Sequence, residues 1–336
     1  MLLVYDEIYG DHLRGIPTPE SPDRVEVVAS FLRESGRFEQ RLPARDASDA
    51  EIERVHSARY LELVKRETGA LRTHAAYLST GDTVLDCRSL DVARRAAGGA
   101  LGAMEAAVDQ QAAVFALIRP PGHHAESSRG MGFCIFNNAA IAARAFLDRH
   151  GGRVLIADID YHHGNGTQAL SGDGISYIST HGYPAYPGTG SADENYDLGG
   201  DAVINIPLPP HRFGTEAFVA LWERVLPQIA AKVRPSLIIV SAGFDYVAGD
   251  PVGDLGVATS AAIDLTQLVN RVAAQYCNGR AVFLLEGGYD LRALAESVAL
   301  VSDTVDSGET APSQAQPAAL PDSVRAVADK VAGLLS

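Results

Sequence analysis

Chemically reactive side chains are concentrated in residues 158–165, where two carboxylates, two imidazoles and a carboxamide directly follow an apolar run. In an extended segment side chains alternate between faces, so Asp158, Asp160 and His162 point the same way if the strand continues that far. Carboxylates and imidazoles on one side of a strand end are suitable ligands for a cation. Solvated polar residues are the simpler interpretation of any one of them. Because burying several unpaired charges is costly, the pattern as a whole favours a metal site.

Three other apolar runs also lead into residues that could take part in catalysis. These residues are His123 and His124 after the run 113–119, Asp245 after 236–242, and Tyr289 after 281–286. Taken singly, each is unremarkable, and a solvated loop is the simplest interpretation of the histidine pair. The carboxyl ends of parallel strands meet at one edge of a sheet, however, and ligands gather there. Four apolar runs that each lead into reactive side chains therefore predict that these side chains meet in one site.

The residue types at these strand ends suit metal-assisted amide hydrolysis. Asp160, His162 and Asp245 form a set of two carboxylates and one imidazole with a coordination position left open, as hydrolytic zinc sites require. Zinc polarises a carbonyl and lowers the pKa of its bound water to about 7. His123 or His124 could move the proton, because histidine titrates in the right range. Tyr289 could donate a hydrogen bond to the oxyanion of the tetrahedral intermediate.

The elements that must position these groups alternate along the chain. Strands are predicted at 2–5, 113–119, 153–160, 175–180, 202–208, 236–242 and 281–286, and helices at 22–35, 48–66, 90–110, 137–149, 214–232 and 257–276. Most of the strand candidates are continuous apolar runs, which is typical of strands covered on both faces. Alternation of strand and helix predicts an α/β fold with a mostly parallel, doubly wound sheet and helices on both faces.

No internal repeat or domain boundary interrupts this pattern. We expect one catalytic domain over residues 1–304, an exposed linker rich in Ser, Thr, Pro and Gln over 305–322, and a C-terminal helix over 323–336. The expected apolar side of that helix consists of Val324, Val327, Val331 and Leu334. Packing on the main domain is its expected role.

Composition excludes several classes of protein. The chain has 42 acidic and 28 basic residues and a formal net charge of −14, which disfavours nucleic acid and anionic membranes and mildly favours cationic small molecules or basic peptides. Its cysteines, Cys87, Cys134 and Cys277, form no CxxC pair and suggest a reducing compartment. Asp6 comes too early for a signal peptide, and no apolar run approaches the ~20 residues of a membrane helix. We expect a soluble, cytoplasmic protein.

Five motifs, in this order along the chain, resemble the motif set of the histone deacetylase and acetylpolyamine amidohydrolase family. They are Pro120-Pro121-Gly122-His123-His124, the segment Gly132-Phe133-Cys134 to Asn138, residues 158–168, Ser241-Ala242-Gly243-Phe244-Asp245 and Glu286-Gly287-Gly288-Tyr289. The resemblance runs from about residue 2 to 300. It implies a three-layer arginase-deacetylase-like fold around a mainly parallel eight-stranded sheet, and a zinc-dependent deacetylase acting on linear amides.

The resemblance also implies roles for individual residues. Asp160, His162 and Asp245 match the ligands of one zinc ion. His124 matches the general base and acid, His123 its electrostatic partner, and Tyr289 the transition-state tyrosine. Asp158 matches the carboxylate that pairs with the first histidine and, with Ser179, helps to bind a structural monovalent cation, K⁺ or Na⁺.

Asn165 stands where some family members have aspartate, as the partner that orients His124. A neutral amide stabilises an imidazolium less than a carboxylate does, so His124 should lose its proton more easily. Asn165→Asp is therefore expected to shift the acidic limb of the pH–rate profile upward.

Four residues match the family's substrate-binding positions. Phe133, with Gly132 before it, and Tyr186 correspond to the walls of a narrow channel, although ordinary packing would also explain both aromatic rings. Asp82 corresponds to an aspartate at the channel rim that grips the substrate.

The natural acyl amine stays open between acetyl-lysine peptides and acetylpolyamines. The segment 67–82 lacks the long insertion of some polyamine-specific members, whereas the opening Val4-Tyr5-Asp6-Glu7 and the acidic composition favour a small cationic substrate. The oligomeric state also stays open, a homodimer included. The alternatives are a binuclear-manganese ureohydrolase of the same fold and a catalytically silent module that binds an acyl ligand.

Overall fold

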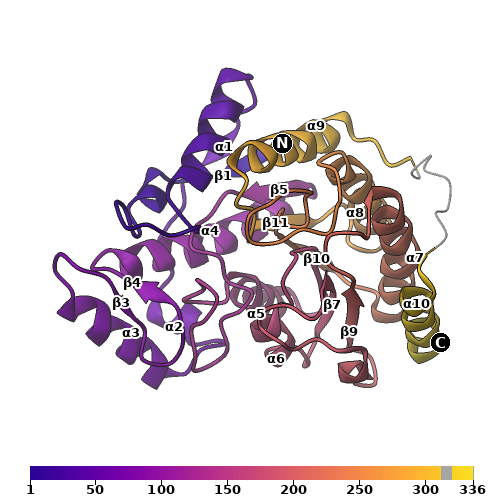
Figure 1. Ribbon diagram of the computed structural model, residues 1–336, viewed down its shortest axis with the longest axis horizontal. Helices are drawn as coiled ribbons and strands as arrows, with labels where there is room; N and C mark the ends of the chain where they lie inside the picture. Colours follow the sequence, from indigo (N-terminus) through magenta and orange to yellow (C-terminus); the bar gives the residue numbers. More distant parts are fainter. Residues whose placement is uncertain (312–319, 336) are drawn as a thin grey trace.

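A nine-stranded sheet runs through the centre of the molecule in the computed structural model, which describes residues 1–311 and 320–335 (Figure 1). Its strand order is β2-β1-β5-β11-β10-β6-β7-β9-β8, and every neighbouring pair is parallel except β8 with β9. The strands are β1 (Leu2–Val4), β2 (Arg41–Leu42), β5 (Ala113–Ala116), β6 (Val154–Asp158), β7 (Ile175–Gly182), β8 (Tyr196–Asp197), β9 (Ala202–Leu208), β10 (Leu237–Ala242) and β11 (Ala281–Leu285). The expected α/β architecture is confirmed, with a short antiparallel edge strand added to eight parallel ones.

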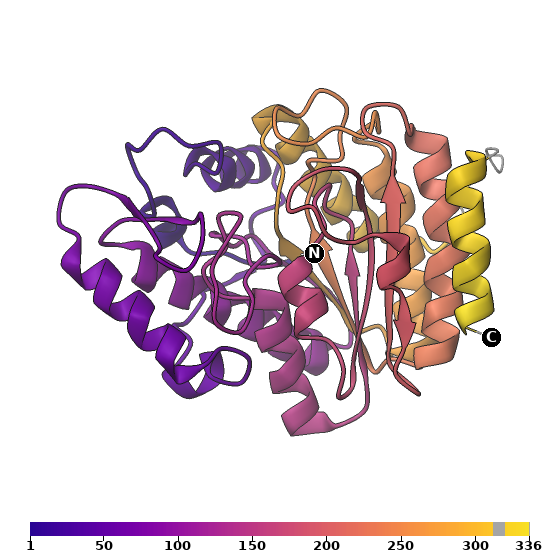
Figure 2. The same cartoon turned by 60° about the horizontal axis from the view of Figure 1, so that its bottom comes forward.

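Helices cover both faces of the sheet. They are α1 (Asp23–Glu34), α2 (Asp49–Ile52), α3 (Ala58–Ala70), α4 (Ser89–Gln110), α5 (Asn138–His150), α6 (Asn165–Ala169), α7 (Thr215–Val233), α8 (Ala261–Tyr276), α9 (Leu291–Ser307) and α10 (Asp322–Leu335), with 3-10 turns η1 (Glu7–Gly10) and η2 (Ala192–Glu194) and a hairpin of β3 (Ala76–Tyr77) and β4 (Val84–Leu85). Helices α4 and α5 pack on one face, and α7 and α8 on the other, with α9 packed against α8 (Figure 2).

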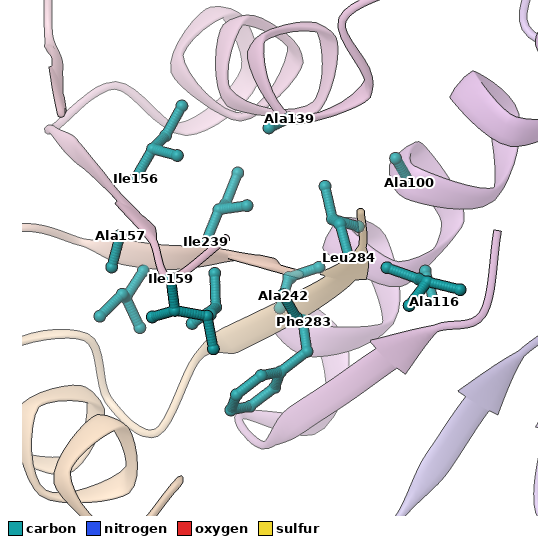
Figure 3. Packing of buried hydrophobic residues seen from close by; sticks show 14 of the residues in the cluster. Ala100, Ala116, Ala139, Ile156, Ala157, Ile159, Ile239, Ala242, Phe283 and Leu284 are labelled. Atoms are coloured by element: carbon teal, nitrogen blue, oxygen red, sulfur yellow. The ribbon is translucent and has the colours of Figure 1, made fainter. Parts of the chain in front are cut away.

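Successive side chains of the central strands point to opposite faces of the sheet and so fill the interfaces with both layers of helices. Ile156, Ile239 and Leu284 point towards Ala139 of α5 and Ala100 of α4, as Figure 3 shows. Neighbouring residues on the same strands, including Ala157 and Phe283, point the other way and pack with side chains of α7 and α8. Every residue of β5, β6, β10 and β11 is buried, which explains why their sequences are apolar throughout.

The strand predicted at 153–160 ends at Asp158, so the alternation proposed for Asp158, Asp160 and His162 does not hold beyond that residue. The Asp158 and Asp160 carboxylates end strand β6. Asp158 Oδ1 accepts the Asp160 N–H (3.2 Å), and Asp160 Oδ1 accepts the His162 N–H (2.8 Å). Such side-chain-to-backbone hydrogen bonds replace the strand ladder and turn the chain. The strand predicted at 113–119 likewise ends early, at Ala116.

The helix predicted at 48–66 is two helices, α2 and α3. Ser48 caps α2 in a capping box with Glu51, and the Ser57 hydroxyl accepts the Tyr60 N–H at the start of α3. The apolar stripe of Ile52, Val55, Tyr60 and Leu63 conceals this break, because the cap Ser57 lies between two of its members.

At the C-terminal end, residues 305–307 belong to α9 and Asp322 to α10, whereas residues 312–319 of the expected linker lie outside the described residues. Helix α10 packs on α7 and β9. Its buried face consists of Val324, Ala328, Val331 and Leu335, with Val327 and Leu334 only half-buried at its sides. Within the described ranges, no helix is both long and apolar enough to span a membrane.

Candidate active site

Three buried side chains converge beyond the carboxyl ends of β6 and β10. The ligand atoms of Asp160, His162 and Asp245 all lie within 4.8 Å of one another. His162 Nδ1 is 3.2 Å from Asp160 Oδ1 and 2.9 Å from Asp245 Oδ2. Asp160 and His162 come from the turn after β6, and Asp245 from the loop after β10, its neighbour in the sheet. Parallel strands in register thus bring together residues that are far apart in the sequence.

The electrostatics of this triad suit a cation. Burial, reinforced by the nearby Asp160 carboxylate, raises the pKa of Asp245 to about 7. Burial lowers the pKa of His162, but its hydrogen bonds and charge interactions with Asp160 and Asp245 outweigh burial and raise it to about 10. Two carboxylates held this close stabilise any positive charge placed between them, and oxygen and imidazole donors are ligands that zinc accepts. The residues therefore fit a metal ion.

Glycine is required where the chain passes the triad. The N–H of Gly287 donates to Asp160 Oδ2 (2.8 Å), and a Cβ at this position would lie 2.6 Å from the same oxygen and closer still to Asp245. Gly287 follows β11, so this third strand end contributes backbone rather than a ligand. A side chain here would displace a carboxylate.

The histidine pair lies beside the triad on the loop after β5, with ring centroids 4.0 Å apart. His123 Nδ1 is 3.1 Å from Asp158 Oδ2. Burial lowers the pKa of His123, but Asp160 and Asp158 outweigh it and raise the pKa to about 10. Burial and the adjacent His123 cation hold the pKa of His124 well below its ordinary value. The pair thus combines a protonated imidazole with a neutral one, a division typical of acid–base sites.

Glu286 anchors the histidine loop, a role that the sequence analysis did not assign. One carboxylate oxygen accepts the N–H groups of Gly122 (2.6 Å) and His123 (3.1 Å), and the other accepts the Ser241 hydroxyl (3.3 Å). Burial raises the pKa of Glu286 to about 7, although His123 opposes the shift. A charged residue ending the apolar run 281–286 was the available signal.

Tyr289 is held over the site by its backbone and by its ring. Asp250 Oδ2 accepts the N–H groups of Tyr289 (2.6 Å) and Asp290 (2.9 Å), and the Arg24 guanidinium lies 4.9 Å from the tyrosine ring centroid. Burial raises the pKa of Tyr289 well above its ordinary value, although Arg24 opposes the shift. The hydroxyl therefore keeps its proton and remains a hydrogen-bond donor.

A cavity of about 520 Å³ leads to these groups. Its walls contain His124, His162 and Tyr289 together with all four residues assigned to substrate binding, and the full lining is Asp82, His124, Gly132, Phe133, Tyr161, His162, Pro184, Ala185, Tyr186, Val252 and Tyr289. The Phe133 and Tyr289 rings are 6.0 Å apart, and those of His124 and Tyr186 5.2 Å. Tyr161, Pro184, Ala185 and Val252 were not foreseen, because nothing in their local sequence indicates a cavity.

Asp82 joins two walls of this cavity. Its carboxylate accepts the Gly132 N–H (2.9 Å) and the Tyr186 hydroxyl (3.0 Å). Gly132 has a φ of +55°, and a Cβ there would collide with the His124 ring, so this position requires glycine. The Asp82 carboxylate thus links the backbone of one wall to the tyrosine hydroxyl of the other.

Asp158 and Ser179 are paired across β6 and β7. Asp158 Oδ2 contacts His123 Nδ1 and accepts the Tyr177 hydroxyl (3.1 Å), while the Ser179 hydroxyl is 2.9 Å from His181 Nδ1. Both side chains are buried, and Asp158 lies against His123.

Two buried arginines share one buried glutamate behind Tyr289. Glu20 Oε1 accepts from Arg24 (3.0 Å) and Arg119 (2.7 Å). Arg24 also donates to the carbonyls of Gly288 (2.7 Å) and Glu286, and so fixes the loop that carries Tyr289. This group was not predicted, because the proline-rich sequence around Glu20 gives no indication of a buried charge there.

We expect Glu20→Gln to destabilise the protein by about 3–5 kcal/mol, since it leaves two buried guanidinium groups without a carboxylate. Urea unfolding of the purified variant measures this. Asp303→Asn is the control, because Asp303 pairs with Arg37 at the surface and its loss should cost under about 1 kcal/mol. Equal effects of the two changes would contradict the prediction.

Known proteins share both the sequence and the fold. The family model described as the histone deacetylase domain matches residues 18–305. The chain is 36% identical over 295 residues to "Histone deacetylase 15" of Arabidopsis thaliana, covering 85% of this chain and 52% of that protein. It is 34% identical over 297 residues to a "Probable deacetylase" of Archaeoglobus fulgidus, covering 86% and 81%. It is 36% identical over 315 residues to "Polyamine deacetylase HDAC10" of Homo sapiens, covering 89% and 46%.

A solved structure agrees over nearly the whole chain. The crystal structure of the HDA15 HD domain superimposes with a TM-score of 0.86 at 32% sequence identity, covering 99% of this chain and 93% of that one. The chain spans about half of the length of the Arabidopsis relative, 52%, but most of the archaeal one, 81%. The matched range 18–305 contains every residue of the candidate site described above. The chain belongs to the histone deacetylase family.

Proposed function

We propose that this protein is a zinc-dependent deacetylase that removes an acetyl or short acyl group from an aminoalkyl amide. The convergence of Asp160, His162 and Asp245 at the end of a cavity that also presents His124 and Tyr289 carries this proposal. Family membership supports it independently. A module that only binds an acyl ligand needs neither a neutral buried histidine nor a tyrosine that keeps its proton.

Each side chain of the site has a part in the reaction. When bound by Asp160, His162 and Asp245, zinc supplies Lewis-acid activation of the amide carbonyl and of the attacking water. His124, held neutral, takes the proton from that water and later delivers it to the departing amine. The Tyr289 hydroxyl donates to the oxyanion of the tetrahedral intermediate.

His123 and Asp158 act electrostatically in this mechanism. Burial and the positive charge of His123 lower the pKa of His124 and keep it neutral before the reaction, and the same charge stabilises the developing negative charge during it. A monovalent cation, K⁺ or Na⁺, bound near Asp158 and Ser179 would complete the charge balance behind the pair.

The cavity suits a linear acylated amine. Phe133 and Tyr186 flank an alkyl chain, and Asp82 places a negative charge at the opening, where an amide N–H or an ammonium group of the substrate would lie. We place small cationic acylated amines ahead of acetyl-lysine peptides on the basis of this charge and the net charge of −14. The name of the human relative, a polyamine deacetylase, is consistent with that order.

A substrate panel tests the proposal. Acetylputrescine, acetylspermidine and acetyl-lysine peptides are assayed with the zinc-loaded protein and again after treatment with a chelator. Chelator-sensitive release of acetate from at least one substrate is expected, and no zinc-dependent turnover on any of them would refute the assignment. Metal analysis tests the ureohydrolase alternative, since one zinc per chain is expected instead of two manganese ions. Across the residues that the structure describes, Asp160, His162 and Asp245 are the one converging group of this kind.

A further inference from the structure

A carboxylate outside the cavity contacts the residue that orients His124. Asn165 lies between them: its Oδ1 is 2.9 Å from His124 Nδ1, and its Nδ2 donates to Glu126 Oε1 at 2.8 Å. Asn165 is buried and starts α6, whereas Glu126 is half-buried and does not line the cavity. Glu126 thus reaches the catalytic histidine only through the amide.

Glu126 sets the donor and acceptor directions of the hydrogen bonds that connect it through Asn165 to His124. An ionised carboxylate only accepts hydrogen bonds, so Glu126 requires the NH₂ group of Asn165 to face it. The amide oxygen must then face His124, and an oxygen at 2.9 Å from Nδ1 requires Nδ1 to carry the proton. The remaining nitrogen, Nε2, is left with a free lone pair, which a general base needs.

The reversed amide would disable the site. With its NH₂ group towards His124, Asn165 would donate to Nδ1 and force the proton onto Nε2, and a neutral histidine in that form cannot accept the proton of an attacking water. An asparagine by itself has no preference between the two orientations, because its oxygen and nitrogen are nearly equal in size. Glu126 therefore decides which tautomer of His124 is present.

The backbone around Glu126 is fixed accordingly. Its N–H donates to the Arg129 carbonyl (2.9 Å) in a tight turn, and its own carbonyl is 3.0 Å from His56 Nδ1. These contacts hold the side chain in place beneath Asn165.

We propose that Glu126 is a positioning residue that selects the Nδ1–H tautomer of His124 through the Asn165 amide. This inference rests on the proposed function and deepens it, because the same reaction needs Nε2 as the base. In Asn165→Asp, the new carboxylate would lie at hydrogen-bond distance from the Glu126 carboxylate, and repulsion between the two like charges would turn it away from His124. The replacement considered from the sequence alone is therefore incompatible with its neighbour.

Exchanging the carboxylate and the amide between positions 126 and 165, singly and together, tests the proposal. Glu126→Gln should lower kcat only about 2–10-fold, since glutamine can still offer its oxygen to Asn165 but no longer enforces that orientation. Asn165→Asp should lower kcat ~10²-fold or more, because repulsion by Glu126 removes the acceptor that orients His124, and losing a correctly oriented general base costs that much. The double variant Glu126→Gln/Asn165→Asp should return to within about 10-fold of the parent, because glutamine can donate its NH₂ to the introduced aspartate, which accepts from His124 Nδ1. Its acidic limb should also lie at higher pH than that of the parent, since a carboxylate now stabilises the imidazolium.

Two kinetic outcomes would overturn the proposal: a double variant no more active than Asn165→Asp, or an Asn165→Asp variant as active as the parent. Glu67→Gln is the control, since Glu67 accepts from Ser79 away from the cavity and its replacement should leave kcat unchanged. Nitrogen-15 NMR of the His124 ring gives a readout independent of turnover, and we expect protonated Nδ1 in the parent. Protonated Nε2 there would overturn the inference, whereas a parent protein inactive on every amide would refute the proposed function instead.

Discussion

Replacing Asp245 with asparagine is expected to abolish both zinc binding and amide hydrolysis. The introduced side chain can still accept the Tyr161 N–H, which Asp245 Oδ1 accepts at 2.8 Å, so the loop should keep its conformation. The other oxygen, 2.9 Å from His162 Nδ1, becomes an NH₂ group that cannot ligate a cation. Because the metal supplies several kcal/mol of charge stabilisation, kcat should fall ~10³-fold or more. Metal analysis and acetate release measure the two effects.

The matched control is Asp254→Asn on the same loop. Asp254 accepts the N–H groups of Gly249 (3.1 Å) and Gly256 (2.6 Å), which an asparagine oxygen can partly replace, and it does not line the cavity. Zinc content and kcat should be retained. In the presence of a chelator, Asp245→Asn should unfold at no lower temperature than the parent, since ionised Asp245 is held at a cost beside Asp160. An Asp245→Asn variant with full zinc content and activity would contradict the ligand assignment.

Tyr289→Phe is expected to lower kcat ~10²–10³-fold while leaving zinc content and KM nearly unchanged, as the loss of one oxyanion donor does. The backbone contacts to Asp250 and the stacking with Arg24 do not involve the hydroxyl, so the phenylalanine ring should keep its place. The effect should also be independent of pH through the neutral range, because the raised pKa of Tyr289 keeps its hydroxyl protonated there. Steady-state kinetics on the best substrate of the panel measure it.

Tyr246→Phe is the control for this change. Tyr246 is more deeply buried than Tyr289, and its hydroxyl has no hydrogen-bond partner within the described part of the chain. Its removal should leave kcat unchanged. A larger loss in Tyr246→Phe than in Tyr289→Phe would show that buried hydroxyls near the site act through packing and not through the oxyanion.

The local sequence was sufficient for the strands and for the identity of the reactive groups. Buried parallel strands need apolar residues on both faces, so the runs 236–242 and 281–286 could be located within one residue of β10 and β11. Polar residues directly after such runs can only lie at the sheet edge. His124, Asp245 and Tyr289 were found for that reason, their residue types suggested their roles, and the family resemblance then singled out His124 as the base.

Contacts between segments far apart in the chain could not be predicted from the local sequence. The break between α2 and α3 depends on caps that an apolar stripe conceals, and the pairing of Glu20 with Arg24 and Arg119 spans 99 residues at its longest. A buried charge leaves no periodic signal, because its partner can lie anywhere in the chain.

The sequence by itself determined the α/β architecture, the donor atoms for a metal and the two histidines, because each depends on residue type and on position relative to a strand end. Only the tertiary structure decided which groups meet. It placed Asp245 against His162, ended the strand at Asp158, and set Asp82 against Tyr186 at the cavity opening. It also put Glu126 against Asn165. The direction of these hydrogen bonds decides the tautomer of His124, and that direction depends on the contacts between the residues rather than on any single residue.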